Sequence, residues 1–482
     1  MSPIGILVIL LLSFSQSNFA STKKLPSEDK DSKIPQPAER IRNEPESVWV
    51  EFIQLALDHK PLNLGQGFPD FAAPQYLVES LHNATRQIDG DENYQKNVLT
   101  HQYTRSFGHP RLVKALRKYY HQFRGFDQLN NEKEQILVTV GAYEALFCSI
   151  MAFVKPGDRV ILIDPAFDAY APMVKMAGGE SVYVPLVQQD KTGGDNITTE
   201  SLRLNMKDLE NKLSDGRTSV LVLNTPNNPL GKVFSRSELE EIAKLCVKFN
   251  ILVISDEVYE QFYYDSSQHM SIATLPKMWD RTITIGSAGK TFSVTGWKIG
   301  WAMGPKHLLR YLQLVHQTAV YTVATPLQEA VARSFEHEMN NLAKGNESGN
   351  LYWKELRRDL LRKRDKMAEV LLRAKLEPIL PEGGYFMVAN FSPLAKIFPE
   401  YNSEGMSNKT GAINSNDYKF ARWLSRVKHL QGIPGSAFYS EENKNLAENL
   451  IRFCFIKSDE TLSRFEILVN NLISDTKPNI ND

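Results

Sequence analysis

The chain has 482 residues, enough for two structural units, because a single hydrophobic core stops growing at about 250 to 300 residues. Hydrophobic residues make up 42% of the sequence and charged residues 23%, the proportions of an ordinary globular protein. The 56 basic and 56 acidic residues balance, which excludes a broad basic surface for nucleic acid or an anionic membrane and favours small-molecule partners.

The first residues form a segment distinct from the rest. Residues 4–12 are almost purely aliphatic and residues 13–20 are small or polar, which resembles a secretory signal and its cleavage zone. The apolar run is shorter than the roughly 20 residues of a spanning helix, so no stable membrane span is predicted. We therefore predict a signal-like leader over residues 1–20, entry into the secretory pathway, and a charged, flexible linker over residues 21–45.

Apolar runs of strand length alternate with helical patterns through the middle of the chain. Residues 235–249 are predicted to be helical, because apolar side chains recur at helical spacing after a capping signal from Ser235 to Glu238. Continuous apolar strands separated by helices are typical of a mostly parallel sheet covered on both faces, so an α/β fold class is predicted. The predicted strands are residues 135–140, 159–164, 219–224, 251–256 and 282–287.

The cysteines do not form a motif. Cys148, Cys246 and Cys454 each lie in an apolar or helix-like run, without a paired or CxxC arrangement. This favours three small buried hydrophobic residues over a disulfide framework or a zinc site. No metal site is predicted.

Polar and small residues follow the predicted strands. In sheets of this kind, ligands bind beyond the carboxyl ends of the strands, so one crevice is expected to gather these residues. They are Gly141, Asp164-Pro165, residues 224–228, Asp256 and residues 287–290.

Three of these positions are candidates for chemistry. Lys290 lies in a Gly-Lys-Thr sequence, but the first glycine of a phosphate loop would have to stand where Thr284 is, which excludes that motif. Asp256 ends a buried strand and needs a cation or hydrogen-bond donor, although a structural salt bridge or a helix cap would also satisfy it. Gly141 opens a helix whose N–H groups can hold a phosphate, and a simple tight turn is the alternative.

Pyridoxal phosphate is a cofactor that needs all three. Its aldehyde requires a lysine amine, its ring nitrogen requires an acid, and its phosphate requires backbone amides with a hydroxyl and a cation. Lys290, Asp256 and the Gly141 turn supply the first parts, and Ser287 and Lys298 supply the hydroxyl and the cation. We therefore predict that pyridoxal 5'-phosphate is bound.

Longer motifs carry a resemblance to a known family. The segments NLGQGFPDF, NTPNNPLGKVF, SDEVYEQFYYD, IGSAGKTFSVTGWKIGW, PEGGYFMV and LIRFCF occur in this order between Asn63 and Phe455. Together they resemble the fold-type I pyridoxal phosphate aminotransferases. The resemblance implies an amino-terminal arm with part of the small domain over residues 46–78, a large cofactor-binding domain over 79–325, a smaller α+β domain over 326–474 and a disordered tail over 475–482.

The resemblance also implies roles for single residues around the cofactor. Lys290 matches the lysine that binds the aldehyde and moves the substrate proton, and Asp256 matches the acid on the ring nitrogen. Tyr103 matches a tyrosine that reaches the phosphate of the neighbouring subunit, which implies a homodimer. The other matching cofactor contacts are Ala142, Tyr143, Phe167, Asn228, Tyr259, Ser287 and Lys298.

A second set matches the substrate contacts of that family. Arg452 matches the arginine that holds the α-carboxylate, since a planar two-pronged donor suits a planar anion. Gly67 and Asn228 match further carboxylate contacts, and Trp49 and Tyr321 match aromatic residues of the side-chain pocket, with a core or interface role left open. Thr322 stands where similar family members have a histidine.

The activity implied is transfer of the amino group of kynurenine, glutamine or another aromatic or sulfur amino acid to a 2-oxo acid. Cleavage of cysteine conjugates at Cβ on the same site is the alternative. A noncatalytic binding protein of the same fold would be expected to lack Lys290 or Arg452, and both are present. Because members of the family are commonly mitochondrial or cytoplasmic, those locations stay open beside secretion.

Overall fold

The structure, a computed structural model, describes residues 35–42, 46–86, 98–129, 134–188, 197–265, 267–343, 351–395, 397–398 and 414–474. The predicted leader and tail lie outside these residues. The described part of the predicted linker contains a short helix, α2 (Glu39–Arg42), which lies beside α8 (Tyr170–Met176).

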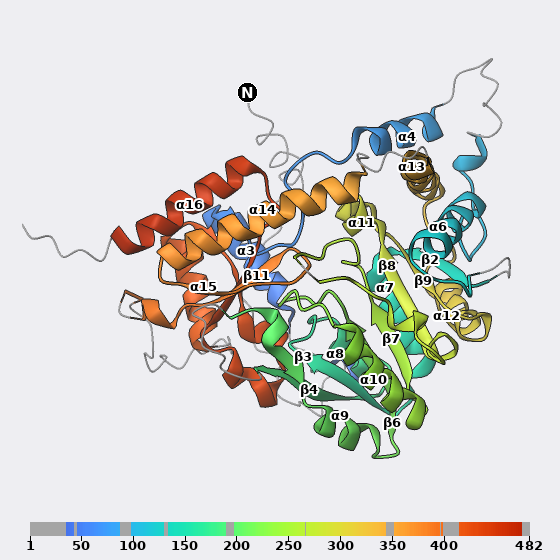
Figure 1. Cartoon of the computed structure of the whole chain (residues 1–482), viewed down its shortest axis with the longest axis horizontal. Helices are drawn as coiled ribbons and strands as arrows, with labels where there is room; N and C mark the ends of the chain where they lie inside the picture. The colour runs from blue at the N-terminus through green and yellow to red at the C-terminus, as the bar shows by residue number, and fades with distance from the viewer. Residues whose placement is uncertain are drawn as a thin grey trace, which may run out of the picture.

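An eight-stranded sheet forms the larger part of the molecule, with the strand order β2-β9-β8-β7-β6-β3-β4-β5 (Figure 1). Strands β4, β3, β6, β7 and β8 run parallel, whereas β9 is antiparallel to both of its neighbours and β5 is antiparallel to β4. The bounds are β2 Ile136–Val140, β3 Arg159–Asp164, β4 Glu180–Gln188, β5 Leu202–Leu204, β6 Thr218–Asn224, β7 Leu252–Asp256, β8 Thr282–Ser287 and β9 Ile299–Met303.

Two smaller sheets are built from the ends of the chain. Strands β10 (Glu377–Ile379), β11 (Phe386–Asn390), β14 (Leu450–Cys454) and β13 (Ile433–Pro434) form an antiparallel sheet in that order, and β1 (Leu62–Asn63) pairs with β12 (Leu430–Gln431) in parallel. The remaining α-helices of the described residues are α3 Val48–His59, α4 Gln75–Thr85, α6 Pro110–Phe123, α7 Gly141–Phe153, α9 Met206–Leu213, α10 Arg236–Lys248, α11 Ala288–Thr291, α12 Lys306–Ala319, α13 Thr325–Ala343, α14 Tyr352–Arg373, α15 Asn416–Val427 and α16 Asp459–Ser474.

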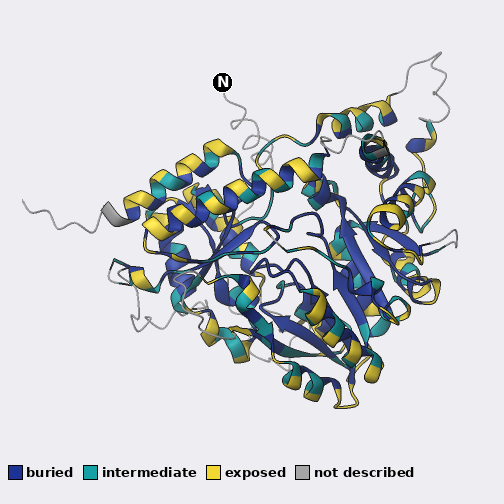
Figure 2. Cartoon of the chain, viewed as in Figure 1, coloured by how far each residue is buried: buried dark blue, intermediate teal, exposed yellow. Residues whose placement is uncertain are grey.

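The large sheet is buried on both faces, as its uninterrupted apolar strands predict. Along β6, Val220 and Val222 belong to one core cluster and Leu221 and Leu223 to another, because successive side chains point to opposite faces. Figure 2 shows the strands buried and the surrounding helices exposed on their outer sides. The α/β fold class with a second, smaller sheet is therefore confirmed.

Local predictions from the sequence agree with the structure. The predicted strands correspond to β2, β3, β6, β7 and β8, and the predicted helix is α10, where Ser235 and Glu238 form a reciprocal capping box. The cysteines are buried and unpaired. Over the described residues, no helix is long and apolar enough to cross a membrane.

The helix α13 packs against α4 and α6, over the end of the large sheet that holds β2 and β9. Helix α3 packs against α15, beside the small sheet. The domain boundaries remain a prediction. For the site, the important result is that the carboxyl ends of β6, β7 and β8 face the small antiparallel sheet (Figure 1).

Candidate active site

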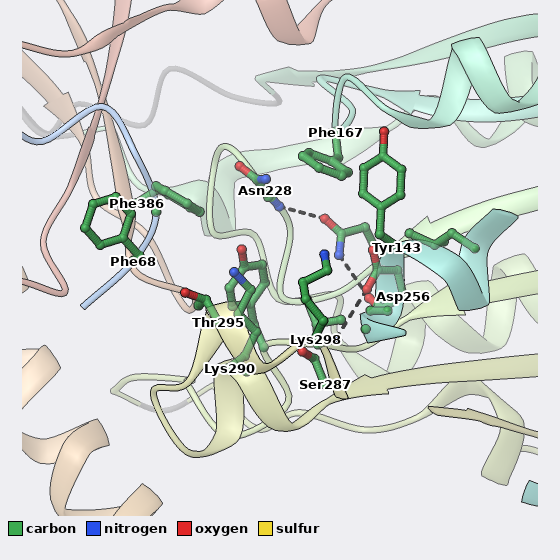
Figure 3. Close-up of a pocket in the computed structure, with 18 of the residues that line it drawn as sticks. Phe68, Tyr143, Phe167, Asn228, Asp256, Ser287, Lys290, Thr295, Lys298 and Phe386 are labelled. Carbon is green, nitrogen blue, oxygen red and sulfur yellow. Dashed lines mark hydrogen bonds between the residues drawn. The ribbon is translucent and has the colours of Figure 1, made fainter. Parts of the chain in front are cut away.

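A cavity of about 350 Å³ opens at the carboxyl ends of the parallel strands (Figure 3). It collects residues that are far apart in the sequence, from α3 to β14. Most of the predicted site residues line it: Trp49, Gly67, Ala142, Tyr143, Phe167, Asn228, Asp256, Tyr259, Ser287, Lys290, Lys298 and Arg452.

The turn between β2 and α7 forms one wall. Gly141, the first residue of the 13-residue helix α7, has φ +70°, a conformation that favours glycine. A Cβ atom at Gly300 of the adjacent strand would lie 2.4 Å from the Ala142 nitrogen, so a glycine is required for this approach. The Lys298 amine lies 5.8 Å from the Tyr143 ring centroid. Free helix N–H groups beside a lysine form an anion site.

Lys290 lies on α11, directly after β8, and its amine points into the cavity together with that of Lys298 (Figure 3). The amine is 5.7 Å from the Tyr259 ring centroid and 5.5 Å from that of Tyr385. Burial lowers the pKa of Lys290 to about 8. A larger fraction of this amine is therefore neutral near physiological pH than for an ordinary lysine, and the neutral amine is the form that a nucleophile or a base requires.

Asp256 ends β7 and lies at the base of the same cavity. Its Oδ2 accepts a hydrogen bond from the Tyr170 hydroxyl at 2.6 Å, and its Oδ1 accepts one from the Val258 N–H at 3.4 Å. Within the described part of the chain it has no ion-pair partner. Burial raises the pKa of Asp256 to about 6. A protonated ring nitrogen is the kind of ligand group that would restore its charge.

Arg452 approaches from the small sheet on β14 and is 1% exposed. It donates to the Asn228 Oδ1 at 2.8 Å and to the Gly65 carbonyl at 2.9 Å, and its Nε is buried without a hydrogen-bond partner among the described residues. Its guanidinium carbon lies 3.9 Å from the Phe386 ring centroid, and burial lowers the pKa of Arg452 to about 10. A buried, under-paired guanidinium is a receptor for a carboxylate.

The loop that carries Gly67 is held in place by side chains that donate hydrogen bonds to its backbone carbonyl groups. Tyr385 donates its hydroxyl to the Gly67 carbonyl at 3.0 Å, and Lys457 donates to the Phe68 carbonyl at 2.8 Å. A Cβ at Gly67 would lie 2.4 Å from the Phe386 ring. The loop therefore has a defined position over the cavity, and a side chain at Gly67 would displace it.

Two of the predicted cofactor and substrate contacts, Tyr103 and Tyr321, do not line the cavity, and neither do Asp164 and Pro165, which were expected in the same crevice. Tyr103 is 83% exposed and Tyr321 is 52% exposed, and their rings meet edge to face with centroids 5.6 Å apart. Both lie on the surface of this chain, so any contact with a cofactor or substrate would have to be made in a second subunit.

The sequence analysis missed several lining residues. Tyr170, the donor to Asp256, is three residues after Phe167 and begins α8, so its proximity to the site follows from a turn whose geometry the sequence does not show. Thr295 and Phe386 also line the cavity, and both occur in the quoted motifs. The missed lining residues include Gln66, Phe68, Tyr170, Thr295 and Phe386.

Comparison with known proteins identifies the family. The family model described as aminotransferase class I and II matches residues 59–465, so the chain belongs to this family. It is an aminotransferase, an enzyme that moves an amino group between amino acids and 2-oxo acids.

Individual relatives cover nearly the whole chain. Kynurenine–oxoglutarate transaminase 3 of Rattus norvegicus is 46% identical over 429 residues, covering 89% of this chain and 88% of the relative. Human kynurenine–oxoglutarate transaminase 1 is 42% identical, over 87% of this chain and 94% of the relative. Among solved structures, Saccharomyces cerevisiae Bna3p superposes with a TM-score of 0.80 at 29% identity, over 92% of this chain and 100% of that one.

Proposed function

We propose that this aminotransferase binds pyridoxal 5'-phosphate in the cavity and uses kynurenine, glutamine or another aromatic or sulfur amino acid as the donor for a 2-oxo acid. The observation that carries the proposal is the joint placement of Lys290 and Asp256. Both are buried, both line one cavity, and each has an ionisation shifted by burial.

The residues present fit the cofactor. Asp256 would meet the ring nitrogen, Tyr259 and Asn228 would donate to or orient the ring oxygen, and Phe167 would cover a ring face. The Gly141 turn, Ser287 and Lys298 would hold the phosphate. When bound, pyridoxal phosphate supplies an electron sink for the pair left on the substrate Cα when its proton is removed.

The chain's own groups perform the remaining work. Arg452 holds the substrate carboxylate, which fixes the Cα–H bond relative to the Lys290 amine. Lys290, with a pKa of about 8, would accept the Cα proton of the held substrate and keep it for return later in the transfer. The aromatic rings of Trp49, Tyr143 and Phe386 line the cavity in which these steps would occur.

The class of amino donor is proposed from the residues that line the cavity and from the names of the relatives. The rings of Trp49, Phe68, Tyr143, Phe167 and Phe386 border the cavity, and flat side chains pack well against such surfaces. The relatives named above carry kynurenine and oxoglutarate in their names.

The decisive experiment supplies kynurenine and 2-oxoglutarate to the purified enzyme and measures kynurenate, which forms by ring closure of the oxo product. A panel of glutamine, phenylalanine, methionine and alanine donors then ranks the side chains. Pyruvate and ammonia from a cysteine conjugate measure the alternative cleavage at Cβ. Absence of kynurenate, with oxo-acid formation from other donors, would reject kynurenine while keeping the aminotransferase.

We also propose a homodimer in which the exposed Tyr103 and Tyr321 complete the partner's site. Sedimentation of the wild type and of Tyr103→Phe tests this, since the variant should remain dimeric while binding the cofactor less tightly. A monomeric active enzyme would contradict it.

Residues 1–20 are proposed to direct the chain to the secretory pathway. Sequencing the amino terminus of the mature protein tests the proposal, and an intact Met1 on the cellular protein would reject cleavage of the leader.

A further inference from the structure

Asp168 lies one residue after Phe167, and none of the cofactor contacts proposed above involves its side chain. Trp49 donates its indole N–H to Asp168 Oδ2 at 3.0 Å, and the Ser47 hydroxyl donates to the same oxygen at 3.3 Å. Ser47 is the N-cap residue of α3, and Trp49 lies in its first turn. One carboxylate oxygen therefore holds the start of the helix that brings a tryptophan to the cavity.

This contact joins opposite walls of the cavity. Asp168 follows β3 of the large sheet, whereas α3 packs on α15 beside the small sheet, where Glu51 pairs with Arg422 at 2.5 Å. The hydrogen bond between Trp49 and Asp168 is thus a tether from one wall to the other. Loss of the tether frees the tryptophan ring without removing the helix from α15.

The carboxylate of Asp168 is buried and only partly satisfied by hydrogen bonds. Its Oδ1 is buried with no hydrogen-bond partner among the described residues, and burial raises the pKa of Asp168 above its ordinary value. A buried oxygen without a donor destabilises the fold. An asparagine at this position would accept these hydrogen bonds only with a neutral amide oxygen, which is a weaker acceptor than a carboxylate, so the negative charge of Asp168 strengthens its hold on Trp49.

Trp49 connects this charge to the substrate site. The Arg452 guanidinium carbon lies 5.4 Å from the Trp49 ring centroid, within the range of a cation–π contact. A carboxylate on the indole N–H makes the ring face more negative and strengthens that contact. Asp168 thereby sets both the tilt of the ring and its attraction to Arg452.

We infer that Asp168 is a positioning residue that fixes Trp49 against Arg452 and so selects amino donors with flat aromatic side chains over small aliphatic ones. The inference rests on the proposed function. Every donor presents its carboxylate to Arg452, whereas the tilt of Trp49 matters only to a side chain large enough to pack on it.

The test compares Asp168→Asn, Trp49→Phe and the double variant, all as holoenzymes. Trp49→Phe keeps an aromatic ring but lacks the N–H that Asp168 accepts. In Asp168→Asn, the ratio of kcat/KM for phenylalanine to that for alanine should fall about fivefold, mainly through KM for phenylalanine. In the Trp49→Phe background, the same substitution should change the ratio less than about twofold, because the residue acts through Trp49.

Glu51→Gln is the matched control, since it weakens another contact of α3 without touching Trp49. It should lower the melting temperature while leaving the donor ratio unchanged. An unchanged ratio in Asp168→Asn, or an equal fall in the Trp49→Phe background, would overturn the inference.

Binding of 3-phenylpropionate and propionate, measured by calorimetry, gives a readout that does not need turnover. Asp168→Asn should weaken the binding of 3-phenylpropionate about fivefold and the binding of propionate less than about twofold. If the wild type transfers no amino group, the proposed function fails, and this binding ratio still decides the role of Asp168: equal changes for both acids would reject it.

Discussion

The two walls of the cavity are built differently. On the wall made by the strand ends of the large sheet, Asp256 is buried without an ion-pair partner among the residues that the structure describes, and Lys290 is buried beside tyrosine rings. On the wall made by the small sheet and α3, Arg452 already donates hydrogen bonds to Asn228 and to the Gly65 carbonyl.

The difference agrees with the ligand proposed for each wall. A cofactor that stays in place can satisfy buried charges permanently, so the first wall leaves them open toward the cavity. A substrate that arrives and leaves at every turnover needs a receptor that is held in position between visits. Substitutions on the first wall should therefore change kcat or cofactor binding, whereas substitutions on the second wall should change KM for the substrates.

The largest effect is expected for Lys290→Ala. Removing the amine should lower kcat by at least about a thousandfold, because no other described side chain at this position can take the Cα proton. The absorbance band of the lysine-bound cofactor should vanish as well. Lys298→Ala is the control, since it should weaken cofactor binding but restore activity at high cofactor concentration. Turnover by Lys290→Ala near the wild-type rate would contradict the assignment.

Asp256→Asn should lower kcat by about 10²- to 10³-fold, because the developing charge on the ring loses its counter-charge. The same substitution should raise the folding stability of the cofactor-free chain, although it lowers kcat. Burial raises the folded-state pKa of Asp256 from its ordinary 3.8 to about 6, so its stabilising contribution is complete below 3.8 and lost as the pH rises through about 6. At pH 8 the cofactor-free variant should be more stable than the wild type, by about 1 to 3 kcal/mol.

Urea denaturation of both cofactor-free proteins between pH 4 and pH 8 measures this gain. Glu257→Gln is the matched control, because the adjacent Glu257 is paired with His269 at 2.9 Å and accepts hydrogen bonds from Ser255 at 2.8 Å and Ser271 at 2.6 Å. That variant should be destabilised with or without cofactor. Destabilisation of cofactor-free Asp256→Asn at pH 8 would show that Asp256 is a structural acid like its neighbour.

Arg452→Lys tests the substrate wall. An ammonium cannot make both observed hydrogen bonds and also receive a carboxylate in the planar geometry of a guanidinium. KM should rise about 10- to 100-fold for donor and acceptor alike, while the cofactor absorbance stays unchanged. Steady-state kinetics with both substrates provide the measurement. A loss of cofactor with unchanged KM would place Arg452 on the other wall.

Tyr170→Phe should give the smallest effect. The hydroxyl donates to Asp256 at 2.6 Å, and its loss should raise the pKa of Asp256 further and lower kcat by about two- to tenfold. The acidic limb of the pH profile of kcat should move to higher pH. An unchanged profile would show that the ring nitrogen alone controls the ionisation of Asp256.

Much of the first wall was determined by the sequence. Apolar runs located β6, β7 and β8, and the residues that end them include Asp256 and Ser287, with Lys290 close behind. The reason is physical: burial on both faces of a sheet imposes an uninterrupted apolar run, and the first polar residue after it lies at the sheet edge. The longer motifs then indicated the family and, with it, Arg452.

Only the tertiary structure decided how the second wall meets the first. Arg452 and Asn228 are 224 positions apart, Trp49 and Asp168 are 119 apart, and no local pattern encodes either hydrogen bond. Tyr170 likewise reaches Asp256 across 86 positions, while Tyr103 and Tyr321 meet on the surface rather than in the cavity. Periodicity reports which face of an element is buried, whereas contacts between distant elements depend on how those faces pack together.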